Sequence, residues 1–386
     1  MSLVLNIARD DFLNGLASVQ NITSKKGTMA ILSNVLIQSE NDAVILTATD
    51  LEIGIKKKLP AEILSSGSIT LPARKLFEIV RESNSDQIHM EILENSWAKI
   101  TDESSNYRLA GMDSEEFPSF PEHREDMLVP VPSETLHDLI NKTIFSVAQD
   151  SESQFTLTTI LVEKEIRDGK NFLNFVSSDG HRLSLMEREV ETDLEKLQVD
   201  KTTLIPRKGM VEIKKLCEEE EGDILFGVEE KQAVFKTENT LYIISLIQGD
   251  FPEFKDIIRI IDREKYFMID RVNLLNSVKR MNLFTEDKYN IITFQIEKNN
   301  LILFSQSMDL GDAREDIGIE FNGDPLLLGF NGKFFVDTLQ IMKSDQVKIF
   351  ISSQDTPCLI ESEDDPDFIS IIMPMHIKNQ KISEAE

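Results

Sequence analysis

The segment Leu204-Ile-Pro-Arg-Lys-Gly-Met-Val-Glu-Ile-Lys-Lys-Leu-Cys-Glu218 determines how the rest of the chain is interpreted. Pro206 is tolerated in the first turn of a helix, and the apolar residues after it recur at helical spacing. The same pattern of entry, basic residue and amphipathic helix occurs at Leu71-Pro-Ala-Arg-Lys-Leu-Phe-Glu-Ile-Val-Arg81 and at Phe330-Asn-Gly-Lys-Phe-Phe-Val-Asp-Thr-Leu-Gln340. Three copies of one helix indicate three copies of a larger unit.

Three further landmarks recur in the same order. A strand–turn–strand segment carries Asp50, Asp179 and Asp309 in its successive copies. An acidic turn with proline closes each unit, at Glu116-Phe-Pro118, Asp250-Phe-Pro252 and Asp365-Pro366. Each unit also opens with its own predicted helix, at Arg9–Thr23, Ser133–Ala148 and Asp270–Leu283. Four landmarks in a fixed order predict a threefold repeat.

Within a unit the predicted order is strand, helix, several strands, helix, several strands. The strands alternate between apolar and polar residues, which is typical of antiparallel sheets with one wet face. Asp179-Gly180 between two such runs predicts a hairpin with a two-residue turn. The fold class is therefore α+β, with helices gathered on one side of antiparallel sheet. We place three repeated domains at residues 1–127, 128–256 and 257–386, the last ending in a short polar tail.

Bulk composition limits the class of protein. A chain of 386 residues fits two to four domains, and its net charge of −27 favours solubility over general affinity for nucleic acid. The two cysteines, Cys217 and Cys358, lie far apart, as expected of core thiols in a reducing compartment. Neither a signal peptide nor a membrane span is visible. We expect a cytoplasmic protein that does not contact membranes.

Catalytic chemistry is not evident in the sequence. Ser178, Asp179 and His181 have the residue types of a catalytic triad, but strand neighbours face opposite sides and cannot form a relay. Histidines and cysteines lack the spacing of metal ligands, so we expect no metal and no cofactor. We expect a protein that is not an enzyme. The alternative is an acidic metal-dependent phosphoesterase that uses Asp309, Asp312 and Asp316.

Charge is sorted along the chain. The six predicted helices together carry net positive charge, whereas the whole chain is strongly acidic. A basic face on a single helix is usually just a solvated face. A bias shared by six helices predicts a common surface that could contact the phosphates of a polyanion without reading bases.

These residues resemble the bacterial DNA sliding clamp family, the beta subunit of DNA polymerase III holoenzyme. The resemblance extends through Ile377 and is carried by six motifs in order: Ala30-Ile-Leu-Ser-Asn-Val-Leu36, Leu71-Pro-Ala-Arg-Lys75, Glu116-Phe-Pro118, Ser178-Asp-Gly-His-Arg-Leu183, Ile205-Pro-Arg-Lys-Gly209 and Met373-Pro-Met375. It implies a homodimer of head-to-tail chains closed into a ring around double-stranded DNA. Helices would line the central channel and sheets would form the outside. The implied function is that of a polymerase processivity factor.

The resemblance also implies two sets of binding residues. The positions that match DNA contacts are Lys26, Arg74, Phe155, Arg207 and Lys208, with Gln154 where the family often has arginine. A hydrophobic pocket for short Leu/Phe-rich motifs of the replicative polymerase, the clamp loader and other proteins maps to Leu157, Ser178, Gly180, His181, Arg182, Leu183, Pro252, Ile257, Tyr289, Asn331, Phe334, Ile371, Met373, Pro374 and Met375. Arg182 is expected to keep its charge in water along one wall of this pocket. Asp256 and His376 replace basic residues common in the family.

For the ring interface, Tyr107, Leu283 and Phe284 match apolar contact positions of the family. The arginines that often precede the Tyr107 position are absent, so we expect fewer ion pairs at this interface. A remaining alternative is a three-domain acidic scaffold that does not bind DNA. Trapping on circular but not linear duplex would exclude that alternative.

Overall fold

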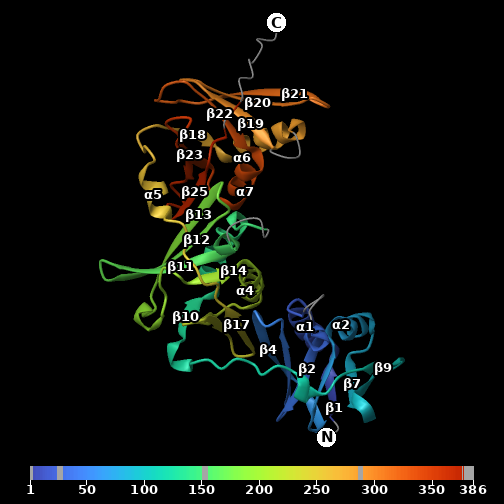
Figure 1. The fold of residues 1–386 in the computed structure, drawn as a ribbon. Coiled ribbons are helices and arrows are strands. Elements are labelled where there is room, and N and C mark those ends of the chain that lie inside the picture. Colours follow the sequence, from blue (N-terminus) through green and yellow to red (C-terminus); the bar gives the residue numbers. More distant parts are fainter. Residues whose placement is uncertain (1–2, 24–28, 150–154, 286–289, 376, 378–386) are drawn as a thin grey trace. The chain divides into compact units, whose positions relative to one another are not determined.

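The structure is a computed structural model that describes residues 3–23, 29–149, 155–285, 290–375 and 377. Within these residues one order of elements occurs three times: strand, helix, a run of strands, helix, and three more strands (Figure 1). The first repeat runs from β1 to β9, the second from β10 to β17, and the third from β18 to β25. The predicted threefold repeat is therefore confirmed, as is the α+β class.

By its internal contacts the chain separates into two compact units. The first comprises residues 1–133, 192–198 and 215–246, and the second comprises 134–191, 199–214 and 247–386. Each unit contains two antiparallel sheets.

The first unit contains a five-stranded and an eight-stranded sheet. The five-stranded sheet has the order β5 (Glu62–Ser65), β1 (Val4–Ala8), β7 (Gln87–Ile92), β8 (Trp97–Thr101) and β9 (Asn106–Ala110). The eight-stranded sheet has the order β10 (Val129–Pro132), β15 (Asp223–Glu229), β16 (Gln232–Lys236), β17 (Thr240–Ser245), β4 (Ile53–Pro60), β3 (Ala43–Thr49), β2 (Asn34–Glu40) and β6 (Ser68–Pro72). The pairing of β17 with β4 joins strands of the first and second repeats into one sheet.

The second unit contains an eight-stranded and a four-stranded sheet. The eight-stranded sheet has the order β14 (Leu204–Pro206), β11 (Thr159–Arg167), β12 (Lys170–Ser178), β13 (Arg182–Val190), β25 (Phe368–Ile372), β24 (Cys358–Glu361), β23 (Gln346–Phe350) and β18 (Tyr266–Asp270). The four-stranded sheet has the order β21 (Gly311–Gly318), β20 (Asn300–Ser307), β19 (Ile291–Ile296) and β22 (Leu326–Asn331). Here β13 pairs with β25, which joins the second and third repeats.

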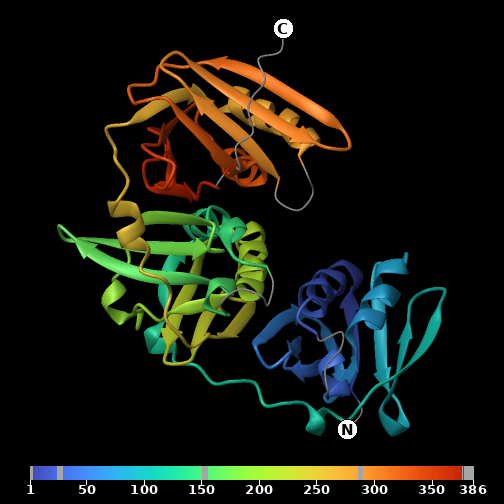
Figure 2. The same ribbon diagram turned by 45° about the horizontal axis from the view of Figure 1, so that its top comes forward.

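In each unit two helices pack together, and one of them contacts both sheets. In the first unit α1 (Arg9–Gln20) packs beside α2 (Ala73–Glu82) and contacts strands of both sheets, β1 as well as β3 and β4. In the second unit α6 (Arg271–Met281) and α7 (Gly332–Ile341) pack together, and α6 contacts β18 of one sheet and β20 of the other (Figure 2). The remaining helices are α3 (Ser133–Asn141), α4 (Arg207–Glu219) and the short α5 (Phe254–Arg259). No helix in the described ranges is long and apolar enough to cross a membrane.

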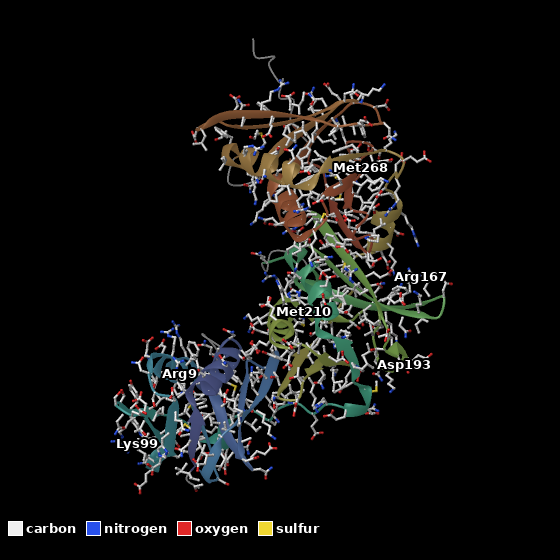
Figure 3. The ribbon with its side chains drawn as sticks, turned by 180° about the vertical axis from the view of Figure 1, so that it is seen from behind. Arg9, Lys99, Arg167, Asp193, Met210 and Met268 are labelled. Atoms are coloured by element: carbon white, nitrogen blue, oxygen red, sulfur yellow. The ribbon has the colours of Figure 1, made fainter. Side chains whose placement is uncertain are left out.

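The apolar stripe predicted for the segment Leu204–Glu218 is buried. Met210, which is labelled in Figure 3, Ile213 and Leu216 of α4 are each at most 3% exposed. Burial also raises the pKa of the Cys217 thiol to about 12, so this cysteine is an inert core residue. One prediction is wrong by a residue: Pro206 ends β14, and the helix begins at Arg207. Pro72 likewise ends β6 before α2, and its ψ of 107° lies outside the helical range.

Candidate functional site

The turn between β12 and β13 is held by its own side chains. The Asp179 carboxylate accepts the backbone N–H groups of His181 and Arg182, each at 3.0 Å. The Ser178 hydroxyl donates to the Arg182 carbonyl at 2.8 Å and accepts the Gly180 N–H at 3.1 Å. Gly180 has φ +88°, a conformation that glycine adopts without strain. The predicted hairpin is confirmed, but three residues, Asp179 to His181, separate the two strands instead of two.

Arg182 at the start of β13 corrects the expectation of a solvated charge. Its side chain is only 8% exposed and forms ion pairs with Asp179 at 3.0 Å and with Asp337 of α7 at 2.7 Å. The guanidinium also donates to the Phe145 carbonyl at 2.6 Å and lies 4.5 Å from the Phe334 ring centroid. Five donors on a planar group can satisfy several partners at once, which is why arginine can be buried here. This network ties the hairpin of the second repeat to a helix of the third.

The seam between β13 and β25 brings together the floor of the predicted pocket. Leu183 pairs directly with Ile371, and the Met373 N–H donates to the His181 carbonyl at 2.8 Å. Leu157, Leu183 and Ile371 belong to one buried apolar cluster, against which Ile257 packs. Leu183 and Ile371 are 3% and 1% exposed, whereas Met373 is 37% exposed. A ligand on this surface therefore meets Met373 directly, whereas Leu183 and Ile371 lie in the core.

The other predicted pocket residues are not members of this buried cluster. Met375 forms a bridge with Gly329 of β22, and the Asn331 side chain caps the N-terminus of α7 by accepting the Lys333 N–H. Pro252 is half-buried, as is Pro374. Tyr289 and His376 lie outside the described residues.

Two phenylalanines of the connection into the third repeat, Phe251 and Phe254, belong to the cluster. They are not among the predicted pocket residues. Phe251 and Phe254 are buried beside Ile257, with ring centroids 6.4 Å apart in an edge-to-face arrangement. A sequence signal for them exists, since Phe-Pro-x-Phe occurs at Phe117–Phe120 and again at Phe251–Phe254. In its first copy Phe120 lies against Gly54 of β4, where a Cβ would approach the ring to 2.8 Å. In both copies the motif packs the segment that connects two repeats against the eight-stranded sheet that these repeats share.

The predicted DNA contacts are placed separately in the two units. Arg74, on α2, has a side chain that is 77% exposed and pairs with Glu78 at 3.3 Å. Arg207 begins α4 and is half-buried, and its Nε has no hydrogen-bond partner among the described residues. Lys208 is exposed, and Phe155, at the start of the short helix Phe155–Thr158, is 67% exposed. Lys26 and Gln154 lie outside the described residues.

Lys333 is not among the predicted DNA contacts, although the repeat places it at the position equivalent to Arg74 and Lys208. Arg74, Lys208 and Lys333 each stand two residues after the strand residue that precedes the helix, namely Pro72, Pro206 and Asn331. All three are exposed and lie in the first helical turn. The helix dipole favours acidic residues there, so helix stability does not account for a cation at this position in all three copies. A function that requires positive charge accounts for it better.

Of the three aspartates of the phosphoesterase alternative, Asp316 is held by neighbouring side chains. The Asp316 carboxylate accepts hydrogen bonds from Arg314 at 3.1 Å and Asn300 at 3.0 Å, and the Arg314 bond is the main cause of its lowered pKa. In the described part of the chain, no three His, Cys, Asp or Glu side chains are arranged to hold a metal ion. Nothing in this geometry favours metal-dependent hydrolysis by Asp309, Asp312 and Asp316.

The apolar residues predicted for the ring interface lie at sheet edges. Tyr107 belongs to β9, the edge strand of the five-stranded sheet. Leu283, which is 69% exposed, and Phe284 belong to the short helix Asn282–Phe284, which packs beside β20 and β21. The strand β21 is itself the edge of its sheet.

Comparison with known proteins covers nearly the whole chain. Residues 3–121, 130–253 and 261–376 match the family models of the N-terminal, central and C-terminal domains of the DNA polymerase III beta subunit. The beta sliding clamp of Chlamydia muridarum is 29% identical over 371 residues, covering 96% of this chain and 98% of that protein.

Solved structures agree with the sequence comparison. The C. crescentus beta sliding clamp, crystallised with polyethylene glycol bound, is 25% identical with a TM-score of 0.90, covering 98% of this chain and all of the other. The sliding clamp of Bartonella birtlesii, bound to griselimycin, is also 25% identical with a TM-score of 0.90, covering 97% of this chain and all of the other.

Proposed function

Because the chain belongs to the family of the DNA polymerase III beta subunit, the bacterial sliding clamp, we propose how its geometry performs the work of a processivity factor. Two chains close head to tail into a ring that encloses duplex DNA and holds the replicative polymerase on its template. The protein is not an enzyme: it acts by topology and by binding. It works in the cytoplasm, where a bacterial chromosome lies. The repeat supports domains close to residues 1–127, 128–256 and 257–386.

Ring closure follows from the two seams inside the chain. A strand from the end of each later repeat, β17 or β25, pairs with a strand of the preceding repeat, β4 or β13. The counterparts left over are β9 of the first repeat and β21 of the third, and both are free sheet edges among the described strands. If β9 of each chain pairs with β21 of the other chain, the same kind of strand pairing occurs at both junctions of a dimer. Two such contacts close a ring instead of growing a fibre.

The repeats also fix the register of this junction. The bridges Thr70–Met112, Leu204–Ile247 and Gly329–Met375 align β9, β17 and β25. The hydroxyls of Ser177 on β12 and Ser305 on β20 each donate to a carbonyl near the end of the repeat's first helix. Their cross-strand partners, Ser184 and Ala313, therefore align β13 with β21. Since Tyr242 pairs with Ile55 and Ser370 with Ser184, the equivalent pair is Tyr107 with Ala313 of the second chain.

This register places opposite charges side by side. It sets Arg108 of one chain opposite Asp312 of the other, and both residues are exposed in the free chain. The exposed Leu283 lies near this edge and would gain an apolar neighbour on closure. Charge complementarity and apolar burial thus favour the same alignment.

DNA contact is supported by the cations that begin the second helix of each repeat. Arg74, Lys208 and Lys333 occupy equivalent positions, and Arg207 adds a guanidinium whose Nε has no partner in the described structure. Because phosphates are the same on every sequence, such contacts let a ring slide. An acidic exterior limits binding elsewhere on the surface.

Partner binding is supported by the surface around Met373. An exposed methionine, the half-buried Pro374 and Ile257, and a rigid hairpin border the buried cluster of Leu183 and Ile371. Methionine adapts its shape to different apolar side chains, which suits a site shared by polymerase, loader and other proteins. Burial of Leu and Phe side chains of a short motif supplies the affinity, at about 25 cal/mol per Å² before ordering costs.

The first test removes the methionine surface and leaves the ring intact. Replacing Met373 and Met375 with alanine should weaken binding of a fluorescent Leu/Phe-motif peptide at least tenfold, measured by anisotropy. Met308→Ala, which removes a methionine that is 96% exposed on the hairpin of β20 and β21, is the matched control and should bind normally. Parental affinity in the double variant, with an unchanged sizing profile, would place the groove elsewhere.

A further inference from the structure

The three repeats treat one strand position in three different ways. β1, β10 and β18 each open a repeat, lead directly into a helix and lie on the same side of the equivalent strands β7, β15 and β23. In the first repeat the outer edge of β1 is covered by β5, with Leu5 opposite Ile63 and Asn6 opposite Glu62. A covered edge cannot pair with another chain.

In the second repeat the same edge is blocked by proline. The Ser133 N–H donates to the Gly222 carbonyl at 3.0 Å, so the alternation of an antiparallel pair turns Pro130 and Pro132 outward. Neither proline has an N–H to offer an incoming strand, and Thr192 bonds the Pro130 carbonyl. This edge is closed without a neighbouring strand.

In the third repeat the edge of β18 is open. The Ile351 N–H donates to the Lys265 carbonyl at 3.0 Å and the Arg271 N–H to the Asp345 carbonyl at 2.8 Å, both within the register of β18 with β23. Alternation therefore turns the backbone groups of Tyr266 and Met268 away from β23. Asn322 accepts the Tyr266 N–H at 3.1 Å, but no strand of the described chain lies beside Met268.

A groove of about 1010 Å³ runs along this open edge. Its lining includes Tyr266, Met268, Lys298, Ile319 and Asn322, together with one acidic residue, Glu320. The Met268 side chain is 42% exposed and is labelled in Figure 3. The groove thus combines free main-chain donors and acceptors with room for an additional strand.

The charge of the missing strand can be read from the first repeat. There a row of hydrogen bonds crosses the sheet from His89 through Asn6 to the Glu62 carboxylate, each at 2.7 Å. In the third repeat Lys348 takes the place of His89, and Met268 takes the place of Asn6. No described strand there supplies an equivalent of Glu62. Lys348 lies 4.0 Å from the Tyr266 ring centroid, and Lys298 lines the groove. Within the described residues neither lysine has a carboxylate within ion-pair distance, so an acidic side chain complements this row.

We propose that the open edge of β18 binds an extended segment of a partner protein by strand addition. The segment takes the position that β5 occupies in the first repeat. It places an acidic residue opposite Met268, where Lys298 and Lys348 attract it, and an apolar residue at the next position. Main-chain hydrogen bonds supply affinity, and the acidic residue supplies selectivity. The residues that line this groove differ from those of the surface around Met373, although Tyr266 packs against the same apolar cluster.

The test uses the full-length protein and a peptide whose sequence is that of β5. Acetylated Ala61–Gly67, Ala-Glu-Ile-Leu-Ser-Ser-Gly, is labelled with fluorescein and followed by anisotropy. We expect saturable binding with half-saturation below about 1 mM, in line with a short strand-addition contact. Deuterium exchange at the Met268 amide should slow when the peptide is present. Absence of binding at about 2 mM peptide, twice the expected limit, overturns the proposal.

Variants separate backbone pairing from side-chain contact. Met268→Pro removes the outward N–H, and β10 shows that proline fits this strand position without loss of the inward ladder. It should weaken binding at least fivefold, whereas Met268→Val, which keeps the N–H, should not. Lys298→Glu should weaken binding of the parent peptide and favour a peptide with lysine in place of its glutamate. Equal binding by Met268→Pro, or displacement of the peptide by a Leu/Phe motif, contradicts strand addition at β18.

Discussion

At the scale of single residues, Arg182 shows how far one side chain can differ from what its sequence context indicates. A hairpin arginine at a predicted binding surface favours a solvated charge, yet this guanidinium is buried between Asp179 and Asp337. Its burial depends on Asp337, 155 positions away in sequence, and no local pattern reports such a contact. The ion pair links consecutive repeats next to the partner surface.

Removing this charge should be costly. Arg182→Met should lower the free energy of unfolding by about 3 kcal/mol, because it leaves two carboxylates without their buried partner. Arg314→Met, which breaks an exposed pair with Asp316, is the control and should cost less than about 1 kcal/mol. Urea unfolding followed by circular dichroism at neutral pH measures both. Equal effects of the two substitutions would mean that the Arg182 network contributes little to stability.

At the scale of elements, most of the fold was predictable from sequence. Amphipathic periods located the helices, and the repeated landmarks gave the order of elements, because both signals are local and occur three times. Most boundaries moved by one to three residues, as at Pro206, which ends a strand, but the predicted helix Ser133–Ala148 ends at Asn141. The pairing of β13 with β25 was not predictable, since residues such as Leu183 and Ile371 are apolar in any buried strand.

The candidate site was predictable in part for the same reason. Its hairpin and its Met373-Pro-Met375 segment carry specific sequence patterns, whereas Phe251 and Phe254 look like ordinary core residues. The open edge of β18 depends on which strands pair, and so it becomes visible only in the structure.

The junction register gives a prediction about sheet edges. Arg108→Asp should weaken the dimer at least tenfold, because it sets like charges opposite each other at the proposed pair with Asp312. Adding Asp312→Arg to the same chain should restore dimerisation, since each junction then holds the reversed pair. Sedimentation velocity across a dilution series measures the dissociation. The only tryptophan, Trp97, lies 5.6 Å from the Arg108 guanidinium, so its fluorescence reports on the same edge. Failure of the double variant to recover would contradict this register.

At the scale of the whole molecule, the acidic exterior and the basic helix starts have separate consequences. The net charge of −27 disfavours general affinity for DNA, and in the proposed ring only a few cations contact the enclosed duplex. Topology then provides retention, and local contacts provide only guidance.

Alanine at Arg74, Arg207 and Lys208 should reduce binding to short primed DNA and lower its salt dependence. The expected slope of log affinity against log salt falls by about two to three units, roughly one for each lost phosphate contact. Alanine at Lys164, Lys170 and Lys231, three basic residues outside the helices, is the control. The same slope in both triple variants would exclude the helix starts as the DNA contact.

Enclosure of DNA by a closed ring is a topological property, and cutting a circular DNA reveals it. The protein is loaded by its own clamp loader onto a nicked circular plasmid, isolated by gel filtration in high salt, and then half of the sample is cut once with a restriction enzyme. We predict that the protein stays with the circle and leaves the linear product within the time of a second filtration. Equal retention on circular and linear DNA, or equal loss from both, would contradict an enclosing ring.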